Sequence, residues 1–257
     1  MSSSRLRNCL HWVIDHAFMK RLCFEIEKRM ETNMDHLNQK LARLCFAVTA
    51  VCCLFGVVLE LWFSYFHESI LPPNAGFTRT FGPGWGSFFN QFVFFTTQSN
   101  IILGITTLLL ALEPRRSSDS FHIWRLIGLI DISITAIVFN FVLANGPSRG
   151  PISHLASIFE HSINPILAIL GWFVFGPSGS VTVRRIVIAA MFPIAYAAFT
   201  LIRGAILIWY PYNILDVTNL GYSGVSIYIV AIFILFLLIA GVLFVFDRWI
   251  RSRLTRT

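Results

Sequence analysis

Six long runs of apolar residues constrain this sequence more than any other feature. Each run has about twenty residues or more, the length that an α-helix needs to cross the hydrocarbon core of a bilayer. The runs lack the period-two alternation of a transmembrane β-barrel. We therefore predict an all-α polytopic membrane protein with six transmembrane helices, at Ala42–Phe66, Phe88–Leu112, Ile123–Asn145, Ile152–Phe175, Ile186–Tyr210 and Gly224–Phe246.

The composition excludes the main soluble classes. Hydrophobic residues make up 56% of the 257 residues and charged residues only 13%, whereas soluble domains have about 45–50% and about 25%. A water-soluble enzyme of this length needs more charged surface than the chain can supply. Disordered proteins and coiled coils need still more polar residues.

The basic residues predict the orientation of the helices. Fifteen lysines and arginines fall in the N-terminal segment, the second and fourth loops and the C-terminal tail, whereas the other loops carry only Arg79 and Arg149. Cytoplasmic loops carry such an excess, so both termini are predicted to be cytoplasmic. The net charge of +7 is explained in this way, without a nucleic-acid partner. The domains are then a basic segment (1–41), a six-helix membrane domain (42–248) and a basic tail (249–257).

Two interpretations of the N-terminal segment stay open. Apolar residues recur there at helical spacing, at Leu6, Leu10, Val13, Ile14 and Ala17. They are typical of an amphipathic helix on the inner leaflet. The segment is equally compatible with a poorly ordered tail. It has no sustained apolar core or cleavage site of a signal peptide.

Polar side chains inside the apolar runs mark a candidate site, because ionisable groups are costly in a membrane. Counting inward from the outer ends of continuous helices puts Thr96 about 12 Å and His161 about 13 Å deep. Glu160 and Arg203 come out near the same level. Thr96, Ser99 and Asn100 share one helix face, at i, i+3 and i+4. A second face carries His154 and His161, with Asn164 one turn below His161, and is predicted to line the same cavity.

Each of these signals has other interpretations. Ser99 and Asn100 can hold helices together, and Glu160 with Arg203 is predicted to form a structural ion pair. Asp131 fits either a proton relay or a hydrogen-bonded core carboxyl. A metal site from His154, Glu160, His161 and Asp216 lacks a known ligand spacing, so we predict no metal and no cofactor.

Four separated motifs resemble a prokaryotic six-helix membrane family of largely uncharacterised function. The signature of that family is FTxQSN, and the matching residues are Phe95-Thr96-Thr97-Gln98-Ser99-Asn100, His161-Ser162-Ile163-Asn164-Pro165, Arg203-Gly204 and Trp209-Tyr210-Pro211-Tyr212. The resemblance covers roughly Ala42 to Arg248. It also implies a location in the bacterial cytoplasmic membrane.

That family is distantly similar to the androgen-induced-gene-like membrane proteins, which are threonine hydrolases of fatty acid esters of hydroxy fatty acids. The resemblance implies Thr96 as the nucleophile and His161 as the catalytic histidine, although the spacing from histidine to proline is one residue shorter here. It also places Tyr210 in a turn that supports the site.

Two functions follow as alternatives. The first is an intramembrane lipid-ester hydrolase, with Thr96 as nucleophile, His161 as base and Asn100 or Ser99 as oxyanion donor. The second is a non-enzymatic small transporter or lipid-binding protein that uses the same polar site. The expected partners are the lipid bilayer and, for the enzyme, a lipid ester. The sequence indicates no oligomeric state.

Overall fold

Helices make up the fold, and no strand occurs among the described residues, which are 3–69, 71–143, 150–176 and 179–254 of the computed structural model. The α-helices are α1 (Ser3–Phe66), α2 (Trp85–Asn90), α3 (Phe95–Leu112), α4 (Asp119–Val138), α5 (Pro151–Ile158), α6 (Asn164–Phe175), α7 (Val183–Leu207) and α8 (Val217–Leu254). Short 3₁₀ turns are η1 (Gln91–Val93) and η4 (Asn213–Leu215), and π-turns are η2 (Phe139–Leu143) and η3 (Phe159–Ile163).

Six helical segments are long and apolar enough to cross a membrane, which confirms the predicted fold class. They are Asp35–Phe66, Phe95–Leu112, Asp119–Leu143, Pro151–Phe175, Val183–Leu207 and Val217–Ser252. The third combines α4 with η2, and the fourth combines α5, η3 and α6. Side-chain caps begin two of the segments, since Ser118 accepts a hydrogen bond from Phe121 N at α4 and Thr182 accepts one from Arg185 N at α7.

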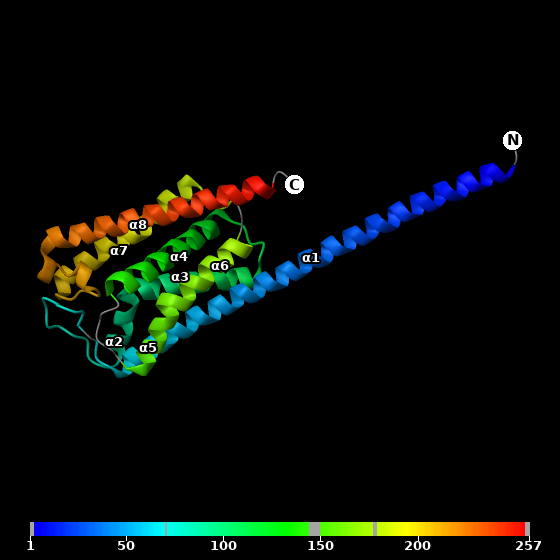
Figure 1. Cartoon of the computed structure of the whole chain (residues 1–257). Coiled ribbons are helices and arrows are strands. Elements are labelled where there is room, and N and C mark those ends of the chain that lie inside the picture. The colour runs from blue at the N-terminus through cyan, green and yellow to red at the C-terminus, as the bar shows by residue number, and fades with distance from the viewer. Residues whose placement is uncertain (1–2, 70, 144–149, 177–178, 255–257) are drawn as a thin grey trace.

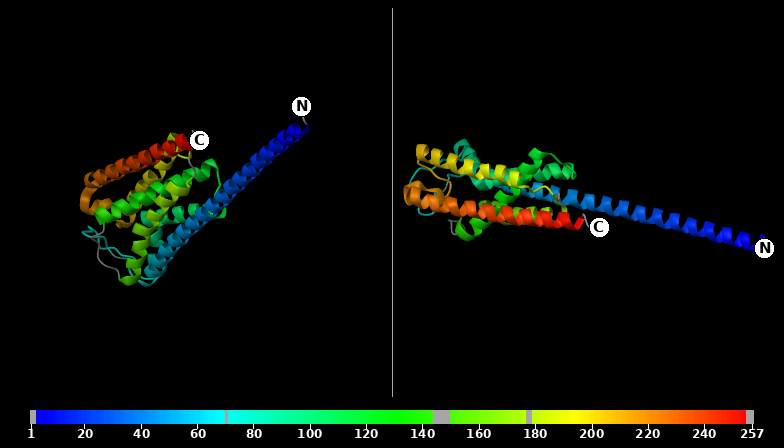
Figure 2. Two further views of the ribbon diagram at one scale, coloured as in Figure 1. Left: turned by 45° about the vertical axis from the view of Figure 1, so that its right-hand side comes forward. Right: turned by 90° about the horizontal axis from the view of Figure 1, so that it is seen from above.

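Helix α4 lies at the centre of the bundle. It contacts α3, α6, α7 and α8, and α1 packs against α3, α5 and α6. The views agree that α7 and α8 lie together on the opposite side of the molecule from α1 (Figure 1, Figure 2). The main core forms around α4, where Leu129, Ile130 and Ile132 are fully buried.

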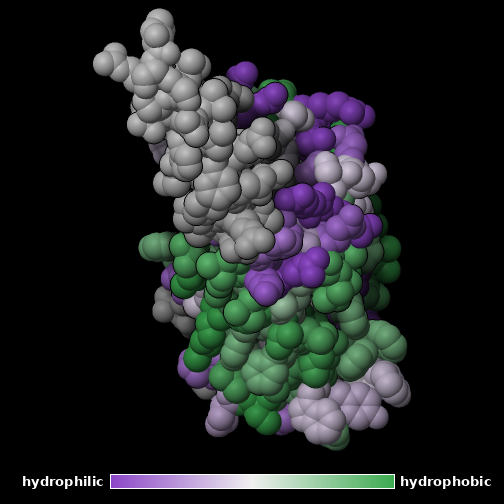
Figure 3. Space-filling model, turned by 90° about the vertical axis from the view of Figure 1, so that its right-hand side faces the viewer, coloured by the Kyte–Doolittle hydropathy of each residue, from purple (hydrophilic) through white to green (hydrophobic). Residues whose placement is uncertain are grey.

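The outer surface of α7 and α8 is apolar. Large side chains such as Val187, Met191, Ile202, Leu238 and Val245 are exposed there. Figure 3 shows apolar side chains gathered in a broad zone of one face, apart from a zone of hydrophilic residues. Exposed apolar surface of this extent is compatible with lipid contact, as in a multi-pass membrane protein.

The second predicted helix is broken, and here the prediction was wrong. The predicted range Phe88–Leu112 contains the end of α2, then η1, then extended backbone at Phe94 (φ −75°, ψ 132°), and then α3. Thr96 is therefore the second residue of a helix. The depth of about 12 Å, which assumed a continuous helix, does not apply.

Helix α1 continues without a break from Ser3 through the first span. Its N-terminal part projects far beyond the bundle (Figure 1). The boundary expected at residue 41 is not a helix end. The amphipathic face predicted from Leu6 to Ala17 belongs to residues whose side chains lie outside the described part of the structure.

Candidate active site

The break before α3 positions Thr96. The ring of Phe94, the extended residue, packs edge-on against Trp209 and Tyr212, at centroid distances of 5.8 and 5.5 Å. Gln98 closes the turn, because its backbone N–H donates to Phe94 O and its side-chain amide donates to Phe92 O. Thr96 thus lies in the first turn of α3, where backbone N–H groups have no acceptor within the helix.

His161 lies in the π-turn η3, and Pro165 gives a physical reason for that turn. Proline has no N–H, so it leaves carbonyls of the preceding turn without a helical donor. The affected carbonyls are those of Glu160 and His161. Asn100 Nδ2 lies 3.3 Å from Glu160 O, and Asn140 Nδ2 lies 3.2 Å from His161 O. Single π-turns inside helices occur frequently at functional sites.

Thr96 and His161 meet, as the sequence predicted. Thr96 Oγ1 lies 3.3 Å from His161 Nε2. His161 Nδ1 lies 2.9 Å from the carbonyl oxygen of Ser157, and a carbonyl can only accept. Ser157 Oγ lies 3.1 Å from the same nitrogen and can accept as well. With these two oxygens as acceptors, Nδ1 carries the proton, and Nε2 presents its lone pair to the threonine hydroxyl. Phe139 stacks on the imidazole at 3.6 Å and fixes the plane of the ring.

Tyr212 is a site residue that the sequence analysis did not select. Its hydroxyl oxygen accepts a hydrogen bond from Thr96 N at 3.3 Å and lies 3.4 Å from Thr96 Oγ1. Burial raises the pKa of Tyr212 to about 12, despite the opposing hydrogen bonds from Thr96. The phenol is therefore a neutral donor. The only sequence signal for it was the Trp209–Tyr212 turn, in which the selected residue was Tyr210.

Ser99, Asn100 and Asn164 support the backbone of the site. Ser99 Oγ and Asn100 Nδ2 donate to Thr96 O at 3.0 and 2.9 Å, and Asn164 Nδ2 donates to Asn100 Oδ1 at 2.7 Å. Their donors point to carbonyls rather than to Thr96 Oγ1, so the predicted oxyanion role of Ser99 or Asn100 is wrong. Asn164 was expected on the cavity wall with His161, but it lies in the contact with α3.

Arg203 does not pair with Glu160, and the predicted ion pair is wrong. Arg203 Nη2 donates to Asn90 Oδ1 at 2.7 Å, and its guanidinium lies 5.0 Å from the ring centre of Trp209. The broken second helix explains the difference, since it brings Asn90 and the aromatic turn to Arg203. Tyr210 is 2% exposed and packs in an apolar cluster with Phe77 and Trp209.

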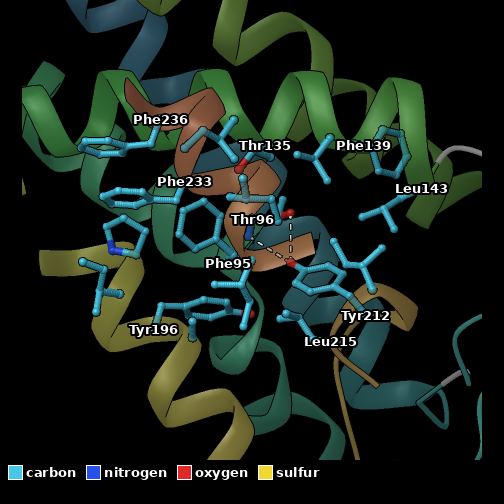
Figure 4. A pocket seen from close by; sticks show the side chains of 18 residues that line it. Phe95, Thr96, Thr135, Phe139, Leu143, Tyr196, Tyr212, Leu215, Phe233 and Phe236 are labelled. Atoms are coloured by element: carbon cyan, nitrogen blue, oxygen red, sulfur yellow. Dashed lines mark hydrogen bonds between the residues drawn. The ribbon is translucent and has the colours of Figure 1, made fainter. Parts of the chain in front are cut away.

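Two cavities meet at Thr96. One, of about 380 Å³, contains many polar side chains, among them Glu60, Ser153, His154, Ser157, Glu160 and His161. The other, of about 160 Å³, is almost entirely apolar and lies between α3, α4, α7 and α8 (Figure 4). Thr96, Phe139, Leu143 and Tyr212 line both. His154 and His161 thus share one cavity, as the sequence predicted.

The remaining acidic residues lie apart from this centre. Asp131 is fully buried, and its carboxyl oxygens have no hydrogen bond to any described residue, so it is not the hydrogen-bonded core carboxyl considered above. Asp216 accepts hydrogen bonds from Gly76 N, Thr218 N and Asn219 N, and so joins the loop before α2 to the start of α8. Within the described ranges, no three His, Cys, Asp or Glu residues gather as metal ligands.

Comparisons of the chain with protein-family models, with curated proteins and with solved structures find no match.

Proposed function

We propose that this chain is a membrane hydrolase of lipid esters, with Thr96 as nucleophile and His161 as general base. The observation that carries the proposal is the Thr96–His161 contact, with the lone pair of the imidazole facing the hydroxyl. A threonine hydroxyl is a weak nucleophile and needs such an adjacent base. The motif resemblance to the androgen-induced-gene-like hydrolases supports the same assignment, and the resemblance to the prokaryotic family supports a bacterial plasma membrane location.

The proposed reaction has two balanced steps. Thr96 Oγ attacks the ester carbonyl carbon and its proton moves to His161 Nε2. The bond from the carbonyl carbon to the alcohol oxygen then breaks, and that oxygen takes the proton. In the second step water gives a proton to His161 and attacks the acyl-threonine. Thr96 Oγ leaves and recovers its proton.

Two donors are placed to stabilise the oxyanion. Because Tyr212 Oη accepts from Thr96 N, its own hydrogen is free to point at Thr96 Oγ1 or at an oxyanion beside it. The N–H of Thr97 belongs to the first turn of α3 and has no helical acceptor. A backbone N–H directly after the nucleophile serves in the same way at the strand-to-helix turn of other hydrolases. The positive end of the α3 dipole adds to the effect.

Substitution of the pair tests the proposal. Thr96→Ala and His161→Ala should each lower ester hydrolysis by about 10⁶-fold, the cost of removing either member of a nucleophile–base unit. The double variant should be no worse than either single variant, because the two residues act as a unit. Thr96→Ser should retain activity. The rate of the wild type should fall in acid, as the imidazole takes up a proton.

Thr106→Ala is the matched control. Thr106 lies on the same helix, but its hydroxyl bonds the Ile102 carbonyl at 2.9 Å and lines neither cavity. Wild-type turnover by folded Thr96→Ala would contradict the proposal. So would a wild type that hydrolyses no lipid ester but moves a solute across vesicle membranes, which would favour a transporter.

A further inference from the structure

The two cavities differ in polarity and meet only at one wall. On the apolar side, just four lining residues have polar side chains, namely Thr96, Thr135, Tyr196 and Tyr212. On the other side, hydroxyl, amide, imidazole and carboxyl groups are common. A substrate whose carbonyl lies at Thr96 therefore has one half in each environment.

The position of His161 decides which cavity receives the alcohol half of the ester and which receives the acyl half. His161 lines the polar cavity and not the apolar one. In ester cleavage the protonated base gives its proton to the leaving alcohol oxygen. That oxygen, and the alcohol attached to it, must then lie on the His161 side of Thr96. The water for the second step must reach His161 from the same side.

The apolar cavity borders the lipid-facing surface of the bundle. Ile194 of α7 and Phe233 of α8 line it and are 47% and 38% exposed on the apolar outer surface. The apolar cavity thus lies directly behind side chains of the outer surface of α7 and α8. Phe236, which also lines the cavity, is fully buried (Figure 4).

We propose that the substrate is the ester of a single fatty acyl chain with a small hydroxylated alcohol. The acyl chain occupies the cavity between α4, α7 and α8, and the alcohol occupies the polar cavity. Apolar lining suits methylene groups, and the hydrogen-bonding side chains opposite suit hydroxyls. This inference rests on the proposed hydrolase function and adds the direction in which the ester binds.

A matched pair of variants on α7 tests the direction. Ala197 lines the apolar cavity, whereas its neighbour Ala198 is exposed and lines neither cavity. Ala197→Phe fills the cavity, and Ala198→Phe places the same ring on the outer surface. The wild type and the two variants are purified and assayed on monopalmitoylglycerol, monobutyrylglycerol and hexadecyl acetate. The last has its long chain on the alcohol.

We expect the wild type to prefer monopalmitoylglycerol over hexadecyl acetate. Ala197→Phe should lower kcat/KM for monopalmitoylglycerol by about tenfold for every two methylenes it excludes from the cavity. The loss should be smaller for monobutyrylglycerol, whose short chain reaches less of the cavity. Thermal unfolding in detergent checks that the variant is folded. Ala198→Phe should match the wild type on all three esters.

The failures of the two proposals differ. Hydrolysis of no ester by the wild type would overturn the hydrolase function itself. The wild type could be active while Ala197→Phe slows hydrolysis of hexadecyl acetate and leaves hydrolysis of monopalmitoylglycerol unchanged. That result would overturn only the proposed direction of ester binding. Equal chain-length dependence in Ala197→Phe and Ala198→Phe would show that the acyl chain lies elsewhere.

Discussion

The hydrogen bonds around Thr96 have a single consistent direction. Thr96 N–H donates to Tyr212, whose hydrogen is left for Thr96 Oγ1, and the threonine hydroxyl donates to His161. His161 in turn donates from Nδ1 to Ser157 O. A backbone carbonyl thus takes the orienting role that a carboxylate has in many catalytic triads. The direction is set at the two ends, because the Thr96 N–H can only donate and the Ser157 carbonyl can only accept.

Removing the Tyr212 hydroxyl should affect the chemistry more than substrate binding. Tyr212→Phe keeps the ring that packs on Phe94 and deletes the hydroxyl proposed as oxyanion donor. We expect kcat to fall by about 10²-fold, the usual cost of one such donor, with KM little changed. Steady-state kinetics on one ester measure the split. An unchanged kcat would remove Tyr212 from the mechanism.

The same substitution should alter stability in alkali. Burial raises the pKa of Tyr212 to about 12, above the value of about 10 in an unfolded chain. The folded state holds the proton more tightly, so this stabilisation is complete below about pH 10. It is lost as the pH rises toward 12. Thermal unfolding in detergent across this range should show a shallower decline for Tyr212→Phe than for the wild type.

At the scale of secondary-structure elements, the candidate site forms where regular helices are interrupted. Extended backbone at Phe94 places Thr96 in the first turn of α3, and the π-turns η2 and η3 bring Phe139 and His161 together. The turn after α7 supplies Tyr212. Gly204 fixes that turn, because a Cβ there would lie 2.0 Å from a ring carbon of Tyr210.

Gly204→Ala should therefore disturb both stability and activity. The added methyl group must push the Tyr210 ring away, at a cost of about 1–3 kcal/mol for overpacking, and Tyr212 should move with the turn. We expect a lower melting temperature and a lower kcat. Gly241→Ala on α8 is the control, since nothing lies within 4 Å of a Cβ there. Equal melting temperatures for the two variants would contradict this role of Gly204.

The whole molecule has two different ends. The loop between α3 and α4, the start of α7 and the C-terminal part of α8 lie at one end (Figure 1). Asp119 links two of these parts, through contacts to Arg184 at 3.3 Å and Arg185 at 2.9 Å. The loop before α2 and the turn after α7 lie at the other end, beside the site. The basic residues predict that the first end is cytoplasmic.

Cysteine labelling tests this orientation. In a variant without the five native cysteines, Thr78→Cys should react with a membrane-impermeant maleimide in intact cells. Ser120→Cys should react only after the membrane is opened. Both positions are exposed, so accessibility reports the side of the membrane. The opposite labelling pattern would invert the topology and place the polar cavity toward the cytoplasm.

The sequence by itself determined the six helices that are long and apolar enough to span a membrane, and it selected the side chains of Thr96 and His161. The length of an apolar run depends only on contiguous residues, so six spans can be predicted without knowing which helices pack together. Thr96 and His161 were found because polar groups in apolar segments are costly and therefore few. Motif resemblance pointed to the same pair.

Only the tertiary structure decided how these residues are used. Arg203 donates a hydrogen bond to Asn90 and lies over the ring of Trp209, so the ion pair with Glu160 does not form. Tyr212 comes within reach of Thr96 across 116 positions of sequence, and the two cavities arise from packing of helices far apart in the chain. These contacts depend on where a helix breaks. A break such as that at Phe94 is set by ring packing against Trp209 and Tyr212, residues which no local pattern around Phe94 contains.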